Sequence, residues 1–135
     1  MHDSPIRILQ FGEGNFLRAF VDEMVDIANE KGVFQGKVAI VKPREAGSIE
    51  AFHRQKNQYT VCLRGRQGGQ EVESFRRIRC IETVLNPYTA YADYLALAEL
   101  PELEFVVSNT TEAGIVFDPA CRQEDMPPSG FPAKL

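Results

Sequence analysis

A pair of glycines between an apolar strand and an amphipathic helix is the feature that most constrains this fold. Residues 6–11 (IRILQF) are rich in apolar, β-favouring side chains and stop at Gly12, which predicts a strand that enters a tight turn. The next segment repeats apolar side chains at spacings of three and four, which predicts a helix that ends at Gly32. Its apolar side is expected to hold Phe16, Phe20, Met24 and Ile27, flanked by Leu17, Val21, Val25 and Ala28, and its opposite side Asp22, Glu23, Asp26 and Glu30.

Two further apolar runs extend this pattern into a sheet. Residues 38–41 (VAIV) and 103–107 are short buried strands by composition, and continuous apolar runs are typical of parallel strands covered on both faces. The order strand, helix, strand predicts an α/β fold, a Rossmann-like nucleotide-binding domain with a mostly parallel sheet. Asn86 and Pro87 are expected to open another helix, with an inner side of Tyr88, Tyr91, Ala92, Leu95 and Ala98.

A β-hairpin is expected to be inserted after the second strand. Ser48 can cap a short helix to about residue 57, and residues 59–63 and 72–81 are then predicted strands joined by a glycine-rich turn at 64–70. The hairpin carries a basic cluster of Arg64, Arg66, Arg76, Arg77 and Arg79. These arginines leave open a non-catalytic binding module that tracks phosphates, although such charges are commonly a solvated face.

Composition and charge exclude several classes of protein. The net charge of −4 argues against a nucleic-acid partner, and the apolar runs are far shorter than the roughly 20 residues that span a bilayer. The three cysteines lie too far apart for a paired metal-ligand set, so no metal is expected. Residues 1–4 are polar and lack a secretion signal, which predicts a cytoplasmic location.

The glycine turn has the residues that a pyrophosphate site needs. Gly12 and Gly14 let the backbone bend and approach a phosphate, and the free N–H groups at the helix start favour an anion. Arg18 can add charge to the same anion, and Asn15 could instead cap the helix. Leu17 stands where the usual third glycine would be, so an ordinary strand-to-helix turn stays open.

The residues after the second strand leave the choice of cofactor unsettled. The acidic ribose ligand of many such domains would stand there, but the chain has Lys42, Pro43 and Arg44, with Glu45 as the nearest carboxylate. The basic side chains could accept the 2′-phosphate of NADP, or they could be solvated loop residues.

Three ordered segments carry a resemblance to a known family. Residues 8–22 (ILQFGEGNFLRAFVD) resemble the start of tagaturonate reductases, in the mannitol dehydrogenase-like polyol dehydrogenase family, whose turn has the form G-x-G-x-F-x-R. Residues 108–115 (SNTTEAGI) resemble the loop near the nicotinamide, and residues 131–135 (FPAKL) resemble a third family segment. The resemblance covers nearly the whole chain and makes Leu17 the family's norm.

The resemblance implies an NAD-binding site within this chain, with NADP less favoured. It assigns cofactor binding to Gly12, Gly14, Asn15, Phe16 and Arg18, and it places Asn109, Thr111 and Glu112 at the nicotinamide end or the substrate entrance. A polar loop of this kind is more often a helix cap, so it stays open whether Thr111 and Glu112 contact the ligand or cap a helix.

The resemblance also implies that the reacting groups lie elsewhere. In this family a catalytic lysine belongs to a helical domain downstream, so no catalytic residue is expected here, and Lys134 belongs to the third segment instead. Residues 1–118 would form the nucleotide domain, and 119–135 a proline-rich tail at which the chain is truncated, with self-association possible. The implied reaction interconverts D-tagaturonate and D-altronate by hydride transfer; mannitol, mannonate or fructuronate are alternative substrates.

Overall fold

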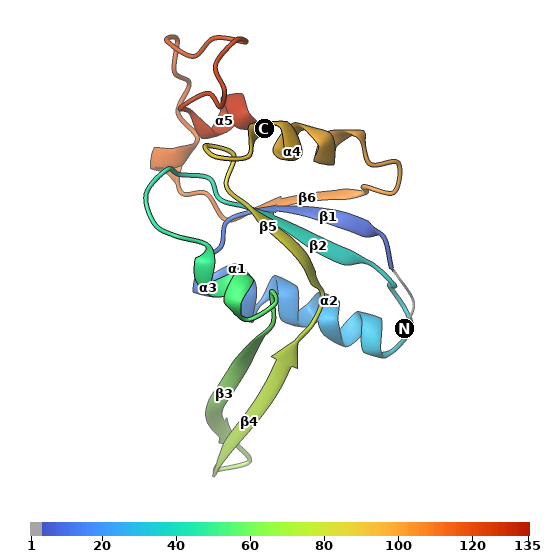
Figure 1. The fold of residues 1–135 in the computed structure, drawn as a ribbon. Helices are drawn as coiled ribbons and strands as arrows, with labels where there is room; N and C mark the ends of the chain where they lie inside the picture. Colours follow the sequence, from blue (N-terminus) through green and yellow to red (C-terminus); the bar gives the residue numbers. More distant parts are fainter. Residues whose placement is uncertain (1–3) are drawn as a thin grey trace.

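Four parallel strands organise the structure, a computed structural model that describes residues 4–135 (Figure 1). Residues 1–3, which belong to the segment read as lacking a secretion signal, lie outside the described residues. The strands are β1 (Ile6–Phe11), β2 (Lys37–Val41), β5 (Ile81–Leu85) and β6 (Phe105–Ser108), in the order β5-β2-β1-β6. The predicted Rossmann-like α/β fold is therefore confirmed.

Register and burial explain why these segments pair as they do. Leu9 of β1 lies opposite Ala39 of β2 on one side and Val106 of β6 on the other. The four residues 38–41 are fully buried, as expected for the interior of a parallel sheet that is covered on both faces.

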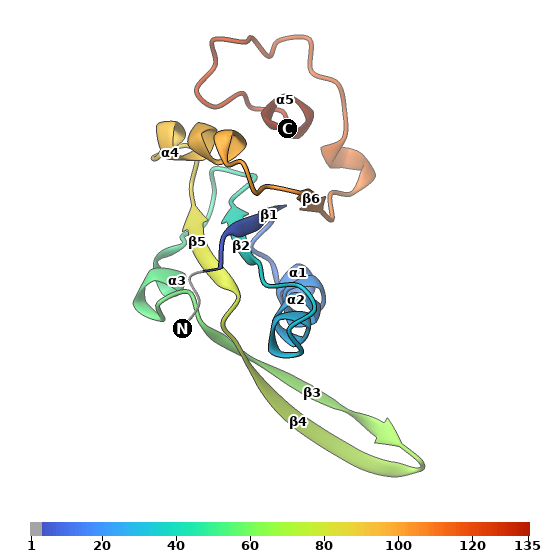
Figure 2. The same ribbon diagram turned by 90° about the vertical axis from the view of Figure 1, so that its right-hand side faces the viewer.

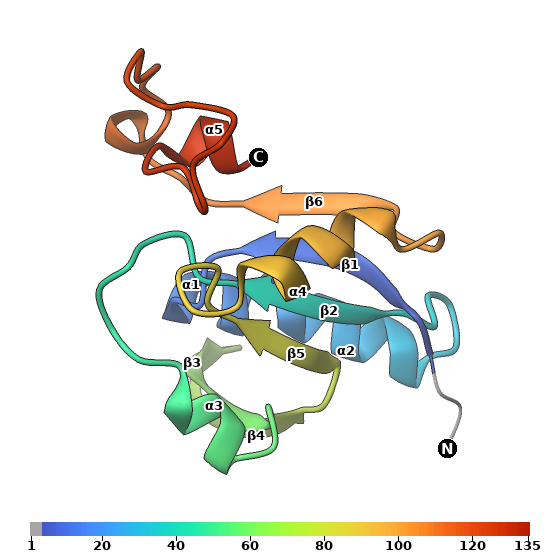
Figure 3. The same cartoon turned by 45° about the horizontal axis from the view of Figure 1, so that its top comes forward.

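Helices cover both faces of the sheet (Figure 3). One face is covered by α1 (Asn15–Ala19), α2 (Val21–Glu30) and α3 (Glu50–Arg54), where Ile8 and Ile40 pack with Val25 and Phe52. The other is covered by α4 (Tyr91–Ala96), the 3₁₀ helix η1 (Leu97–Glu99) and α5 (Phe131–Lys134). A second 3₁₀ helix, η2 (Glu112–Gly114), follows β6. In the described range 4–135, no helix has the length and apolar character needed to cross a membrane.

The inserted hairpin is present, but its second strand is shorter than predicted. Strands β3 (Tyr59–Gln67) and β4 (Gln70–Ile78) form a separate antiparallel sheet that projects away from the parallel one (Figure 2). Gly68 and Gly69 both have positive φ, as a two-residue hairpin turn requires. The predicted strand 72–81 is wrong in its last residues, because the chain changes partner after Ile78 and β5 joins the parallel sheet beside β2.

The first predicted helix buries residues that flank the expected apolar stripe, and not the stripe itself. It is interrupted at Phe20, and its stripe of Phe16, Phe20 and Met24 is 61%, 52% and 49% exposed. Leu17 and Val25 face the sheet instead. Val25 packs in the same core cluster as Ile8 of β1.

The inner face predicted for the helix after Asn86 is wrong in part, since Tyr91 packs against the core but Ala92, Leu95 and Ala98 are exposed. The Asn86 side chain accepts a hydrogen bond from the Tyr88 N–H, but a turn intervenes and the helix begins only at Tyr91. Tyr94 and Leu97 are buried, whereas Leu95 is half exposed. Because the helix begins at Tyr91 and not at Pro87, the side of the helix that faces the sheet differs from the predicted one.

The proline-rich segment at the end of the chain returns to the sheet. The ring of Phe131 lies 5.4 Å from that of Phe11, and the Tyr94 hydroxyl donates to the Lys134 carbonyl. The last helix therefore belongs to the apolar layer that covers this face of β1.

The burial of the central strands predicts a large difference between two isoleucines. Ile40→Ala should lower the free energy of unfolding by about 3 to 4 kcal/mol, because Ile40 is fully buried and its loss leaves a cavity. Ile115→Ala is the matched control, since Ile115 is 61% exposed and should change stability by less than about 0.5 kcal/mol. Urea unfolding followed by circular dichroism measures both, and equal losses would contradict this placement of the core.

Candidate functional site

The first glycine of the turn is required by backbone conformation and by crowding. Gly12 has φ +134°, which side-chain-bearing residues rarely adopt, and its N–H donates to the Val41 carbonyl at 3.0 Å. A Cβ there would lie 3.2 Å from Leu17 Cδ1 and 3.3 Å from Asn109 Oδ1. The turn therefore bends sharply where β1 ends.

The second glycine, Gly14, is required neither by its backbone conformation nor by crowding from neighbouring atoms. Gly14 has φ −73° and ψ 166°, an extended conformation open to any residue, and a Cβ there would meet no atom within 4 Å. Neither strain nor packing within the described residues explains a glycine here. What the missing side chain leaves is free space directly in front of the backbone at the start of α1.

The helix start also holds a polar pair and a cation. Gly14 is the N-cap, so the prediction that Asn15 could cap the helix is wrong; the Asn15 side chain instead accepts a hydrogen bond from the Arg18 guanidinium. That guanidinium lies over the rings of Phe52 and Tyr59, 5.1 and 5.2 Å from their centroids. Cation–π contacts therefore hold the positive charge beside the turn.

The end of β6 brings a second predicted segment to the same place. Ser108 lies opposite Phe11, so the residues that follow both strands meet at the carboxyl edge of the sheet, where open α/β sheets bind ligands. Asn109 thereby reaches Gly12, as the contact above shows. Thr111 and Glu112 are exposed at the start of η2, and Thr111 makes no side-chain cap there.

The basic residues after β2 do not form one group. Lys42 is 1% exposed and its ammonium donates to the carbonyls of Arg44 and Ala46, so it is neither a solvated loop residue nor a free phosphate ligand. Arg44 and Glu45 are exposed. Both roles considered for Lys42 are therefore wrong, because its own loop takes up the charge.

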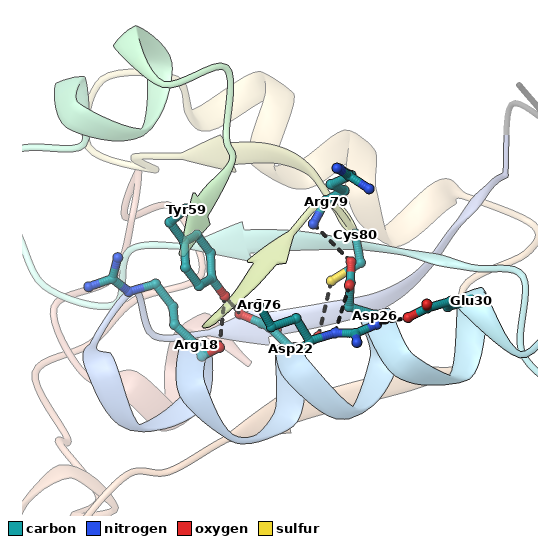
Figure 4. A network of polar contacts seen from close by, with 8 residues as sticks. All are labelled: Arg18, Asp22, Asp26, Glu30, Tyr59, Arg76, Arg79 and Cys80. Carbon is teal, nitrogen blue, oxygen red and sulfur yellow. Dashed lines mark hydrogen bonds and ion pairs between the residues drawn. The ribbon is translucent and has the colours of Figure 1, made fainter. Parts of the chain in front are cut away.

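Beneath the turn lies a buried polar network that the sequence analysis missed (Figure 4). Asp22 and Gln10 are fully buried, and the Gln10 amide donates to Asp22 Oδ2 at 3.2 Å and to the Gly12 carbonyl at 3.1 Å. The hydroxyl of Tyr59 lies 3.1 Å from the same carboxylate oxygen. Gln10 was the available signal, since a lone amide inside an apolar strand needs a buried partner.

Burial changes the proton affinity of this carboxyl group. Desolvation raises the pKa of Asp22 from its ordinary value of 3.8 to about 6, and the hydrogen bonds from Gln10 and Tyr59 and the charge of Arg18 only partly oppose it. Burial, together with the neighbouring carboxylate, also raises the pKa of Tyr59.

The hairpin arginines are largely paired with carboxylates. Arg64 contacts Glu73 at 2.7 Å, Arg66 contacts Glu71 at 3.8 Å, and Arg76 contacts Asp26 of α2 at 3.1 Å. Arg76 also bonds Glu30, which lowers the pKa of that carboxyl group. Three of the five arginines are thus paired with carboxylates, while the Arg77 guanidinium donates to the Gln58 side chain at 2.8 Å. In residues 4–135, no three His, Cys, Asp or Glu side chains are grouped to hold a metal ion.

Sequence comparison finds relatives over nearly the whole chain. Residues 6–133 match the family model described as the mannitol dehydrogenase Rossmann domain. Altronate oxidoreductases from Phocaeicola vulgatus, Bacteroides thetaiotaomicron and Bacillus subtilis are 50%, 49% and 44% identical over 131 residues. Each alignment covers 97% of this chain and 27% of the relative, so the chain spans about a quarter of the length of these proteins.

Solved structures share the fold. Pseudomonas fluorescens mannitol 2-dehydrogenase, solved as a ternary complex with NAD and D-mannitol, superposes with a TM-score of 0.73 at 21% identity, over 83% of this chain and 23% of that one. A D-sorbitol dehydrogenase in substrate-free form gives 0.67 at 22% identity, over 85% and 24%.

The raised pKa predicts an unusual dependence of stability on pH. Folded Asp22 binds its proton more tightly than the unfolded chain does, so the stability it contributes is complete below about pH 4 and is lost as pH rises through about 6. The loss should be roughly 3 kcal/mol, and Asp22→Asn should lack it. Urea unfolding of both chains across this range measures it; parallel curves would contradict the raised pKa.

Proposed function

The chain belongs to the mannitol dehydrogenase family, and from this we propose that it binds NAD as the cofactor domain of an altronate oxidoreductase. The proposed reaction of the longer enzyme interconverts D-tagaturonate and D-altronate. Gly12 and Gly14 would hold NADH at its pyrophosphate, and the bound cofactor would supply the hydride for the keto carbon. The name of the relatives supports this substrate over mannitol, mannonate or fructuronate, the alternatives within the wider family.

The open space at Gly14 is the observation that carries the proposal. A glycine with ordinary φ and no neighbour within 4 Å of its absent Cβ serves neither the turn nor the packing. It does serve a ligand whose pyrophosphate must come close to the backbone. Gly12 makes the bend that brings this backbone to the edge of the sheet.

The side chains near Gly14 are assigned to the two ends of the proposed cofactor site. Asn15 and Phe16 frame the turn at the start of α1, and Arg18 lies near enough to offset the charge of an anion. Asn109, Thr111 and Glu112 follow β6, where we place the nicotinamide end of the site. Asn109 is the best supported of the three, because its amide oxygen lies against Gly12.

The structure around β2 favours NAD over NADP. Lys42 is committed to loop carbonyls and cannot also neutralise a 2′-phosphate, which leaves only the exposed Arg44 for that task. NADPH should therefore bind no more tightly than NADH.

We assign catalysis to a part of the longer enzyme outside residues 1–135. Residues 1–118 would hold the dinucleotide, while proton transfer and substrate binding would fall to the region that this chain does not include. The purified chain is accordingly expected to bind cofactor without reducing tagaturonate. The cytoplasmic location stays a prediction from the sequence.

Substitution of Gly14 tests cofactor binding. Gly14→Asp should abolish NADH binding in calorimetric titrations, because its side chain occupies the pyrophosphate approach and adds negative charge. Gly65→Asp is a matched control, since Gly65 in β3 also has open space around its absent Cβ and lies on the hairpin. NADH binding that survives in Gly14→Asp, or that is absent from the wild type, would contradict the proposal.

Exposed apolar side chains predict self-association of the isolated chain. Phe105 and Val106 on the edge strand are 51% and 53% exposed, and Phe16 and Phe20 expose a joined aromatic surface. Sedimentation should therefore give a mass that rises with concentration, and Phe20→Ser should reduce this rise. Ala19→Ser, at an exposed neighbouring position, is the control. A monomer mass at every concentration would contradict the prediction.

A further inference from the structure

We propose that Asp22 and Tyr59 are positioning residues for the dinucleotide turn, so that the base of the inserted hairpin forms part of the cofactor site. This inference rests on the proposed NAD binding and adds residues that lie beneath the turn and touch no cofactor. Figure 4 shows the Tyr59 hydroxyl of β3 between the Asp22 carboxyl group of α2 and the backbone carbonyl of Arg18 in α1.

The first link runs from the carboxylate to the turn through β1. The Gln10 amide spans Asp22 Oδ2, at 3.2 Å, and the carbonyl of Gly12, at 3.1 Å. Because Gly12 has φ +134°, the direction of its carbonyl sets the direction of the backbone that leads to Gly14. Asp22 thereby fixes the rotation of the Gln10 amide, and the amide fixes the bend.

The second link runs from the hairpin to the start of the helix. The Tyr59 hydroxyl lies 2.9 Å from the Arg18 carbonyl and 3.1 Å from Asp22 Oδ2, and its one proton is shared between these acceptors. Its ring also lies beneath the Arg18 guanidinium. Tyr59 therefore holds both the backbone and the charge of the residue that ends the glycine motif.

The network has no spare donors to compensate for a lost contact. Within residues 4–135, Gln10 Oε1 and Asp22 Oδ1 are buried without a hydrogen-bond partner, so the carboxyl group is held through Oδ2 alone. The other groups around it are already engaged: the Cys80 thiol donates to the Asp22 carbonyl, and Asp26 pairs with Arg76 one turn later. Loss of one donor should therefore loosen the turn.

Binding of NADH to a small set of variants separates positioning from stability. Tyr59→Phe keeps the ring and removes the hydroxyl, and it should weaken NADH binding about tenfold, as expected for the loss of one partly buried hydrogen bond. Tyr94→Phe is the matched control, because it removes a buried tyrosine-to-carbonyl bond on the other face of the sheet, and this bond goes to Lys134 and not to a residue of the turn. It should lower the melting temperature similarly and leave NADH affinity unchanged.

The chemistry at residue 22 gives a rescue test. Asp22→Asn retains an acceptor oxygen for Gln10 and Tyr59, so its NADH affinity should stay within about threefold of the wild type, whereas Asp22→Leu should lose about tenfold or more. Hydrogen exchange of the peptide that contains Gly12 and Gly14 should accelerate in Tyr59→Phe and not in Tyr94→Phe. This second readout needs no ligand.

The possible outcomes distinguish positioning by Asp22 and Tyr59 from the NAD binding on which it rests. If the wild type binds NADH and Tyr59→Phe matches Tyr94→Phe in affinity and exchange, positioning by the hairpin is wrong while cofactor binding stands. If the wild type binds no NADH, cofactor binding fails, and the inference fails with it. A loss confined to Tyr59→Phe and Asp22→Leu supports both.

Discussion

The hydrogen bonds to the buried carboxyl group of Asp22 are the interactions on which the arrangement around the turn depends. A group that cannot reach water must find its partners within the protein, and here these come from β1 and from the hairpin. Strand, helix and insertion are thereby held in one relative position. The apolar layers stabilise the sheet, and this polar contact joins the turn to the helix and the hairpin beside it.

Three glycines meet three different demands in this small region. Gly12 provides a backbone conformation, and Gly114 avoids a collision, since a Cβ there would lie 2.3 Å from the Thr110 methyl group. Gly14 meets neither demand and leaves space outside the protein. The same residue type is therefore explained by the structure at two positions, while at the third the open space is what the proposed cofactor site rests on.

The sequence predicted the elements of the fold better than the faces they bury. The apolar runs of β1 and β2 and the glycine turn are local signals, and each was placed correctly. Asp22 was assigned to solvent because helical spacing allows two adjacent apolar columns, and only contact with Gln10 selects between them. The burial of Lys42 likewise depends on hydrogen bonds to loop carbonyls, which the spacing of residues does not predict.

The point at which a strand changes its pairing partner is equally difficult to predict from a sequence. The run from residue 72 to 81 favours extended backbone throughout, yet its first part pairs within the hairpin and β5 pairs with β2. Strand propensity describes a single residue, whereas a switch between sheets is a property of the neighbours. The turn was accessible to prediction because its cause is local, whereas Gln10 alone indicated a buried partner without identifying Asp22 or Tyr59.

The closed geometry of the hairpin has a consequence for protein engineering. Tyr59 lies opposite Ile78, so the chain leaves the main body and returns to it at adjacent points. Everything beyond the pair of Val61 and Arg76 can in principle be shortened, lengthened or exchanged for another peptide without moving β5. The tip at Gly68 and Gly69 is thus a natural attachment point for a fluorophore or an affinity tag, remote from the glycine turn.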